Sequence, residues 1–149
     1  MDDRTILLVE DDPRDADLTV RAFKKAQIGH RIVVVDDGAD AIAYLLGSRD
    51  DAAEDDRGLP DVVLLDLELP RTSGMEVLRC IRAHERTRVL PVVILTSSDD
   101  ERDRVDGYRC GCNGYVRKPL RYAQFADAVA RLGLYWTATN ERPYRPKDR

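Results

Sequence analysis

Short runs of apolar residues alternate along the chain with longer segments in which apolar and polar positions are mixed. Five runs have the length of a β-strand. They are Thr5–Glu10 (TILLVE), Arg31–Asp36 (RIVVVD), Asp61–Asp66 (DVVLLD), Pro91–Thr96 (PVVILT) and the weaker Gly114–Arg117 (GYVR). Because their apolar residues are continuous rather than alternating with polar ones, the runs are typical of strands covered on both faces, as in a parallel sheet.

The segments between these runs have the spacing of helices. Pro13 suits the first turn of one helix, Ser73 is a candidate N-cap of another, and a last helix is predicted from about Leu120 to Trp136. The segment 99–111 (DDERDRVDGYRCG) is highly charged and has only a weak apolar stripe. Apolar positions at helical spacing elsewhere are Leu18 and Ala22; Ala41, Ile42, Leu45 and Leu46; Met75, Leu78 and Ile81; and Phe125, Val129, Leu132 and Trp136.

Five successive strand–helix units predict an open, doubly wound α/β domain. Ligands of such domains bind beyond the carboxyl ends of the strands, where the strand order reverses. For the order 2-1-3-4-5, that point lies between the first and third strands. We expect residues 1–136 to form the domain and residues 137–149 to form a C-terminal tail. The acidic segment 47–60 is predicted to be an exposed loop.

Composition narrows the class of protein. The chain has 149 residues, which suits one domain, and its 28 acidic and 24 basic residues give a net charge of -4. This balance does not favour direct nucleic-acid binding, which usually needs a basic surface. No apolar run is long enough to span a membrane, and the acidic start MDDRTILLVEDDP is unlike a secretory signal, so we expect a cytoplasmic protein.

The three cysteines do not form an evident disulfide or metal pattern. Cys80, Cys110 and Cys112 are odd in number and unevenly spaced. Two thiols in CGC, with no histidine nearby, are too few for a closed zinc site. We interpret all three as reduced thiols.

Acidic residues follow two strands that are predicted to be neighbours. Glu10, Asp11 and Asp12 end the first strand, and Asp66 ends the third. Carboxylates this close repel one another unless a cation joins them. Carboxylates, a backbone carbonyl and water are the usual ligands of Mg²⁺. We therefore predict a Mg²⁺ site with Asp11 and Asp66 as direct ligands, Glu10 bound directly or through water, and the backbone carbonyl of Glu68.

Two further strand ends add complementary groups to this edge of the sheet. The fourth strand ends at Thr96, which offers a hydroxyl, and the fifth leads to Lys118, which offers a positive charge. Acids, a hydroxyl and a lysine together favour a phosphoryl group as the bound species. Asp66 would be the nucleophile that forms an aspartyl phosphate, with Thr96 and Lys118 contacting the phosphoryl oxygens.

At these residues the chain resembles the receiver domains of two-component response regulators. The matching segments are LLVEDDP, VVLLDLELP, SGMEVL, VVILTSS and GYVRKPL, which occur in order from about Ile6 to Leu120. The resemblance implies a flavodoxin-like five-stranded parallel sheet of order 2-1-3-4-5, with helices on both faces. It places the family's acidic pocket on Glu10 and Asp11, its phosphoacceptor on Asp66, its hydroxyl on Thr96 and its lysine on Lys118.

The resemblance also implies a mechanism and a partner. A sensor histidine kinase would transfer a phosphoryl group to Asp66 with Mg²⁺ bound, after which Thr96 would move toward the phosphoryl group and Tyr115 would turn inward. Both are therefore predicted switch residues. The peptide bond between Lys118 and Pro119 is expected to be cis. Glu10 stands where many receivers have Asp, and Glu68 adds negative charge near the phosphoacceptor.

The output is expected to be protein contact, because the short tail has no room for a DNA-binding helix-turn-helix. The acidic insertion, the PRTSG loop and the tail around Trp136 resemble single-domain regulators paired with phytochrome-type histidine kinases, which tend to form homodimers. Some apolar residues of the last helix would remain exposed as a dimer interface, unless all of them are core. These residues are Tyr122, Phe125, Val129, Leu132, Tyr135 and Trp136.

Three other functions use similar features. A Mg²⁺-dependent phosphohydrolase of the haloacid-dehalogenase type also forms an aspartyl phosphate, but its nucleophile lies on the first strand of its core. A flavodoxin-like FMN-binding protein would need a phosphate loop, and VEDDPRD would repel a phosphate. A non-phosphorylated scaffold would usually lack an acid or the lysine, and none is missing here.

Overall fold

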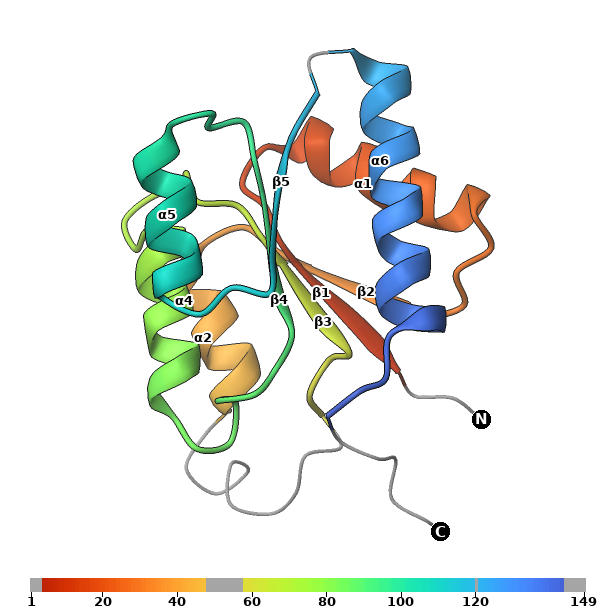
Figure 1. Ribbon diagram of the computed structural model, residues 1–149. Helices are drawn as coiled ribbons and strands as arrows, with labels where there is room; N and C mark the ends of the chain where they lie inside the picture. Colours follow the sequence, from red (N-terminus) through yellow and green to blue (C-terminus); the bar gives the residue numbers. More distant parts are fainter. Residues whose placement is uncertain (1–3, 48–57, 120, 144–149) are drawn as a thin grey trace, which may run out of the picture.

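A five-stranded parallel sheet forms the centre of the molecule in the computed structural model, which describes residues 4–47, 58–119 and 121–143. The strand order is β2-β1-β3-β4-β5, so the predicted order and fold class are confirmed (Figure 1). The strands are β1 (Thr5–Val9), β2 (Arg31–Val35), β3 (Val62–Leu65), β4 (Val92–Thr96) and β5 (Gly114–Arg117). The helical segments are α1 (Pro13–Lys25), α2 (Gly38–Leu46), α4 (Gly74–Ala83), α5 (Glu101–Arg109), α6 (Tyr122–Leu134) and the π-helical η1 (Tyr135–Thr139).

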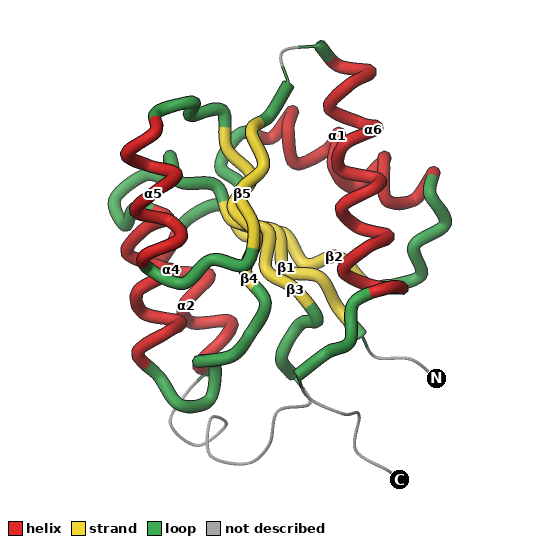
Figure 2. Tube along the Cα trace, in the orientation of Figure 1, coloured by secondary structure: helices red, strands yellow, loops and turns green. Residues whose placement is uncertain are grey.

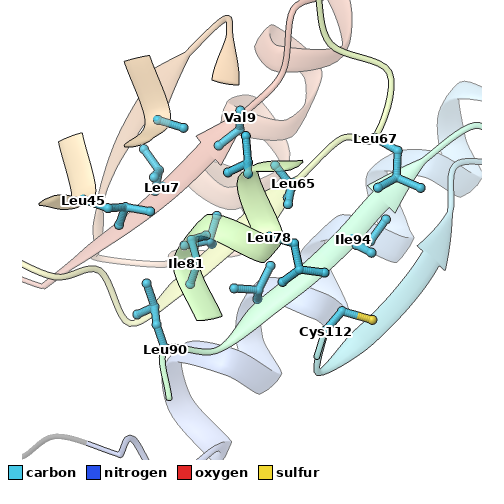
Figure 3. Close-up of a cluster of buried hydrophobic side chains, with 14 residues drawn as sticks. Leu7, Val9, Leu45, Leu65, Leu67, Leu78, Ile81, Leu90, Ile94 and Cys112 are labelled. Atoms are coloured by element: carbon cyan, nitrogen blue, oxygen red, sulfur yellow. The ribbon is translucent and has the colours of Figure 1, made fainter. Parts of the chain in front are cut away.

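Helices cover both faces of the sheet. α1 and α6 pack together on one face, and α2, α4 and α5 lie on the other (Figures 1 and 2). Alternate residues of each central strand therefore enter different cores: Leu7 of β1 packs in the core under α2 and α4, and Leu8 packs in the core under α1 and α6. Figure 3 shows the first core, where Leu7, Leu65 and Leu78 meet from β1, β3 and α4.

Burial on both faces explains why the central strands are uninterrupted apolar runs. Every residue of β3, and every residue of β1 and β4, is buried. Each fully buried aliphatic side chain contributes roughly 1.5–3 kcal/mol relative to an exposed one. In contrast, the edge strand β2 is only partly buried, although its sequence is equally apolar. The run of valines in β2 thus does not by itself distinguish an edge strand from a central one.

Local signals begin the helices at the carboxyl edge of the sheet. Asp12 caps α1 by accepting a hydrogen bond from the Arg14 backbone, and Pro13 occupies the first turn. Ser73 caps α4 as predicted, in a reciprocal capping box with Glu76. Because α1 begins just after the end of β1, and α4 begins after the loop that follows β3, these two helix starts fix the position of the loops that carry the acids.

Two local predictions differ from the structure. The described chain contains no cis peptide bond, so the expected cis bond between Lys118 and Pro119 is wrong. A trans bond is favoured before proline by about 0.5–1 kcal/mol unless the surroundings select the cis form. The last helix also does not end at Trp136, because helical structure continues through η1 to Thr139.

The domain boundary at residue 136 stays a prediction. Most of the predicted acidic loop, residues 48–57, and residues 144–149 of the tail lie outside the described residues.

The apolar residues of α6 are divided between the core and the surface. Phe125 and Val129 are buried, and Leu132 and Trp136 pack partly against the same core. Tyr122, Leu134 and Tyr135 are exposed. Of the residues considered for a dimer interface, the tyrosines are therefore the ones left at the surface.

Among the described residues, no helix combines the length and the apolar character needed to cross a membrane.

The chain after η1 is joined to the amino edge of the sheet. Arg142 donates to Asp61 Oδ1 at 3.1 Å, and His30 Nε2 lies 2.6 Å from Asp61 Oδ2. Asp61 directly precedes β3, and His30 directly precedes β2. A buried carboxylate thus connects the C-terminal segment with two strands.

Replacing Arg142 with alanine is expected to lower the free energy of unfolding by about 1–3 kcal/mol, because the buried Asp61 carboxylate loses a charged donor. Urea titration followed by the fluorescence of Trp136 would measure the change. Arg131→Ala is the control, since Arg131 forms an exposed pair with Asp127 and its loss should cost under about 0.5 kcal/mol. Equal stability of the two variants would contradict a structural role for the Arg142 contact.

Candidate functional site

The strand order brings the acids that follow β1 and β3 together. Val9 and Leu65 are register partners at the ends of these strands, and the Asp66 N–H donates to the Val9 carbonyl at 3.1 Å. A carboxylate oxygen from each of Glu10, Asp11 and Asp66 lies within 4.8 Å of the other two. Glu10 and Asp66 are 3% and 5% exposed, whereas Asp11 lies at the surface. The three acids therefore share one half-open site at the point where the strand order reverses.

Lys118 enters this site from the loop after β5. Its ammonium group donates to Glu10 at 2.6 Å, to Asp15 at 2.9 Å and to Asp66 at 3.0 Å. The Lys118 backbone N–H donates to the Thr96 carbonyl at 2.7 Å, which holds the loop against the end of β4. Lys118 is only 8% exposed. A buried ammonium group thus binds three carboxylates.

The charges in the site shift one another's pKa values. Burial by itself disfavours the charged lysine, but the hydrogen bonds that Lys118 donates to Glu10 and Asp15 outweigh burial, so the pKa of Lys118 is raised. Burial raises the pKa of Glu10 to about 7; the hydrogen bond from Lys118 opposes this rise, and the negative charge of Asp66 adds to it. Glu10 therefore titrates near neutral pH in the metal-free protein.

In the presence of a chelator, raising the pH from 4.5 to about 7 is expected to lower the contribution of Glu10 to stability by on the order of 2 kcal/mol. The sign follows because the folded protein holds this proton more tightly than the unfolded chain, which releases it near pH 4.5. Urea titrations at pH 5 and pH 7.5 would measure the change. Glu10→Gln should remove this part of the pH dependence, and an unchanged dependence in that variant would contradict the assignment.

Glu68 contacts Asp66, Thr96 ends the strand next to β3, and Tyr115 lies on β5, before Lys118. The Thr96 side chain is buried at the end of β4, and its Oγ1 accepts a hydrogen bond from the Ser98 N–H at 3.4 Å. The Glu68 N–H donates to Asp66 Oδ1 at 3.1 Å, and its carboxylate accepts from Ser97. The role of the Glu68 carbonyl as a metal ligand stays a prediction. The Tyr115 hydroxyl donates to the Ser98 carbonyl at 3.3 Å, so Tyr115 is connected to the loop after Thr96.

The loop after Asp66 has no space for an added side chain at Gly74. A Cβ atom there would lie 2.1 Å from the Asp66 carbonyl oxygen and 2.6 Å from Leu67 Cα. The Gly74 N–H also donates to the Leu67 carbonyl at 3.0 Å. The start of α4 thus packs directly on the backbone of Asp66 and fixes its position.

Sequence reasoning did not identify Asp15 as part of the site. Asp15 lies in the first turn of α1, four residues after Asp11, and its carboxylate reaches Lys118 from the side of the helix. An acid in the first turn was visible in the sequence, but such acids are common because they suit the positive end of a helix dipole. Its distance from Lys118 depends on how α1 sits over the sheet.

The chain belongs to the response regulator receiver domain family, because the model of that family matches residues 6–130. Members of this family work in two-component signalling. The fold and the set of residues at the carboxyl edge of the sheet agree with this assignment.

Similar proteins include regulators from several organisms. The probable methanogenesis regulatory protein FilR2 of Methanothrix harundinacea is 39% identical over 93% of this chain and 86% of its own length. Response regulator Rcp1 of Synechocystis is 31% identical over 94% of this chain and 93% of its own length. The Mn²⁺-bound structure of Rcp1 matches with a TM-score of 0.83 over 95% of this chain and 99% of that one. The phosphorylated cyanobacterial phytochrome response regulator RcpA is 33% identical, with a TM-score of 0.86 over 96% of this chain and 100% of that one.

Proposed function

We propose that this protein accepts a phosphoryl group on Asp66 from a sensor histidine kinase and passes the signal on through protein contacts. The observation that carries the proposal is the meeting of Glu10, Asp11, Asp66 and Lys118 at one edge of a receiver-family sheet. Of the three acids, only Asp66 follows β3. This strand lies between β1, which Glu10 and Asp11 follow, and β4, which ends at Thr96, so Asp66 is the phosphoacceptor.

The acids fit a hard divalent cation. They offer closely spaced carboxylate oxygens, which are the ligands that Mg²⁺ prefers, and the exposed Asp11 leaves room for water. Glu10, Asp11 and Asp66 would hold Mg²⁺ together with the Glu68 carbonyl. The bound ion would supply positive charge against the phosphoryl oxygens. The Mn²⁺-bound structure of Rcp1 supports a divalent ion in this family.

The chain's own groups would complete the transfer. An Asp66 oxygen forms a bond to phosphorus as the bond between phosphorus and the donor breaks, and that electron pair leaves with the donor. Thr96 would donate its hydroxyl to a phosphoryl oxygen, and Lys118 would bind another. When the Thr96 side chain and its loop move, the Ser98 carbonyl that Tyr115 contacts moves with them. Tyr115 would thereby transmit the change to α5 and β5.

The phytochrome-type kinase and the homodimer belong to this proposal. The similarity to RcpA, described as a phytochrome response regulator, supports a kinase of that type. The exposed Tyr122, Leu134 and Tyr135 offer apolar area on α6 and η1 for a second copy. The family match favours this signalling role over the phosphohydrolase alternative.

Incubation with acetyl phosphate and Mg²⁺ tests the phosphoacceptor function. We expect the intact protein to gain the mass of one phosphoryl group, and we expect excess chelator to prevent the gain. A protein that stays unlabelled with Mg²⁺ would refute the proposal. Labelling that is equally fast in chelator would refute the metal's part in it.

A further inference from the structure

Asp15 provides the third acceptor of the Lys118 ammonium group. A lysine ammonium has three donors, and here they go to Glu10, Asp66 and Asp15. Glu10 and Asp66 belong to the group of acids that could hold a metal ion, which comprises these two and Asp11. Asp15 therefore differs from the other two acceptors, because its carboxylate is available to Lys118 whatever the metal site holds.

Lys118 also donates a hydrogen bond to Asp66, the residue that has to be phosphorylated. Asp66 Oδ2 accepts from Lys118 at 3.0 Å, and Asp66 Oδ1 accepts from the Glu68 N–H at 3.1 Å. Both oxygens of the phosphoacceptor are thus hydrogen-bonded in this state. A carboxylate oxygen that accepts a charge-assisted hydrogen bond is a weaker nucleophile, since its lone pairs are stabilised. Phosphoryl transfer is therefore favoured when Lys118 releases Asp66, yet Lys118 has to stay near enough to contact the phosphoryl group afterwards.

Asp15 is placed to hold Lys118 through this change. It lies in the first turn of α1, whose start is fixed by the Asp12 cap and Pro13. The Asp15 side chain is 31% exposed, so it lies toward the open side of the site, whereas Glu10 and Asp66 are buried beneath. An ammonium group that moved toward Asp15 would move away from the metal ligands without leaving the site.

We propose that Asp15 is a positioning residue that retains the Lys118 ammonium group while Asp66 is released for phosphorylation. This inference rests on the proposed phosphoacceptor function of Asp66. Of the three carboxylates that accept from Lys118, only Glu10 and Asp66 remain when Asp15 is removed. Lys118 then stays bound to Asp66, the nucleophile. Removal of Asp15 therefore slows phosphorylation.

The sign of this effect separates positioning from simple charge. Loss of a negative charge beside the site lowers the repulsion of an anionic donor such as acetyl phosphate, so electrostatics alone predict faster labelling. Positioning predicts slower labelling, and the effect requires Lys118. A variant without Lys118 cannot form the hydrogen bond to Asp15, but the charges of Asp15 and of acetyl phosphate are unchanged. The effect of Asp15→Asn in that variant therefore shows whether positioning or charge repulsion acts.

The first test measures labelling rates with acetyl phosphate at saturating Mg²⁺. We expect Asp15→Asn to be about fivefold slower than wild type, as for the loss of one partly exposed charged hydrogen bond. Asp17→Asn, which changes an exposed acid of the same helix that pairs with Arg21, should leave the rate unchanged. In a Lys118→Met background, Asp15→Asn should cause no further slowing. An Asp15→Asn rate equal to or above that of wild type, or the same slowing without Lys118, overturns the inference.

The second test does not depend on phosphorylation. The ammonium signal of Lys118 can be followed by NMR in protein labelled with ¹⁵N-lysine, as Mg²⁺ is added. We expect the wild-type signal to persist at saturating Mg²⁺ and the Asp15→Asn signal to be lost through fast proton exchange. Loss of the wild-type signal on adding Mg²⁺ overturns the inference. A signal that persists in both proteins also overturns it. If the wild-type signal persists, the Asp15→Asn signal is lost and acetyl phosphate does not label the protein, the phosphoacceptor function fails while the retention of Lys118 by Asp15 stands.

Discussion

Asp66→Asn is expected to abolish labelling by acetyl phosphate while leaving a folded protein. An amide has no carboxylate oxygen that could form an acyl phosphate, and the other acids of the site do not follow β3. The side-chain amide oxygen of the variant can still accept from the Glu68 N–H, and one repelling charge is removed, so the fold should persist. Intact-mass spectrometry measures the labelling, and circular dichroism verifies the fold.

Asp37→Asn is the matched control for this experiment. Asp37 is also a buried acid at the carboxyl edge of the sheet, but it caps α2 and pairs with Arg71. Asparagine caps helices nearly as well as aspartate, so we expect labelling close to that of wild type. Full labelling of Asp66→Asn would show that another residue is the phosphoacceptor.

Lys118→Met is expected to lower the free energy of unfolding by about 3 kcal/mol at pH 8 in the presence of a chelator. The change leaves Glu10 and Asp66 as neighbouring buried carboxylates without their shared cation, and removing one partner of a buried ion pair is costly. Added Mg²⁺ should restore most of the loss, since it would supply positive charge to the same acids. Urea titrations with chelator and with Mg²⁺ measure both effects.

The same variant should be phosphorylated yet fail to respond, because Lys118 would no longer bind the phosphoryl oxygens. Lys24→Met serves as the control for stability, because Lys24 is exposed on α1 and its replacement should change stability by less than about 0.5 kcal/mol. If Lys118→Met were as stable as Lys24→Met in chelator, the repulsion assigned to the acids would be wrong. A normal change of near-ultraviolet spectrum on phosphorylation would show that Lys118 does not couple the site to the fold.

The strands and helix starts could be predicted because they depend on residues close together in the sequence. The continuous run of β3 indicated a strand buried on both faces, and Ser73 is the N-cap of α4 as predicted. The predicted end of the last helix failed, since Thr137 and Thr139 continue it as η1. Helix ends are weakly encoded when no glycine or proline follows at once. The peptide bond at Pro119 also depends on its surroundings rather than on the dipeptide itself.

The five strands, the parallel sheet and the acids, hydroxyl and lysine at the strand ends could be predicted from sequence, because hydrophobic periodicity and strand ends are properties of short segments. Which side chains contact one another across the fold could not be predicted in this way. The contact between Lys118 and Asp15 joins residues 103 positions apart, and that between Arg142 and Asp61 joins residues 81 positions apart. Such contacts depend on where α1 and the chain after η1 pack against the sheet, and this packing reflects the sum of many weak interactions across both cores rather than any local pattern.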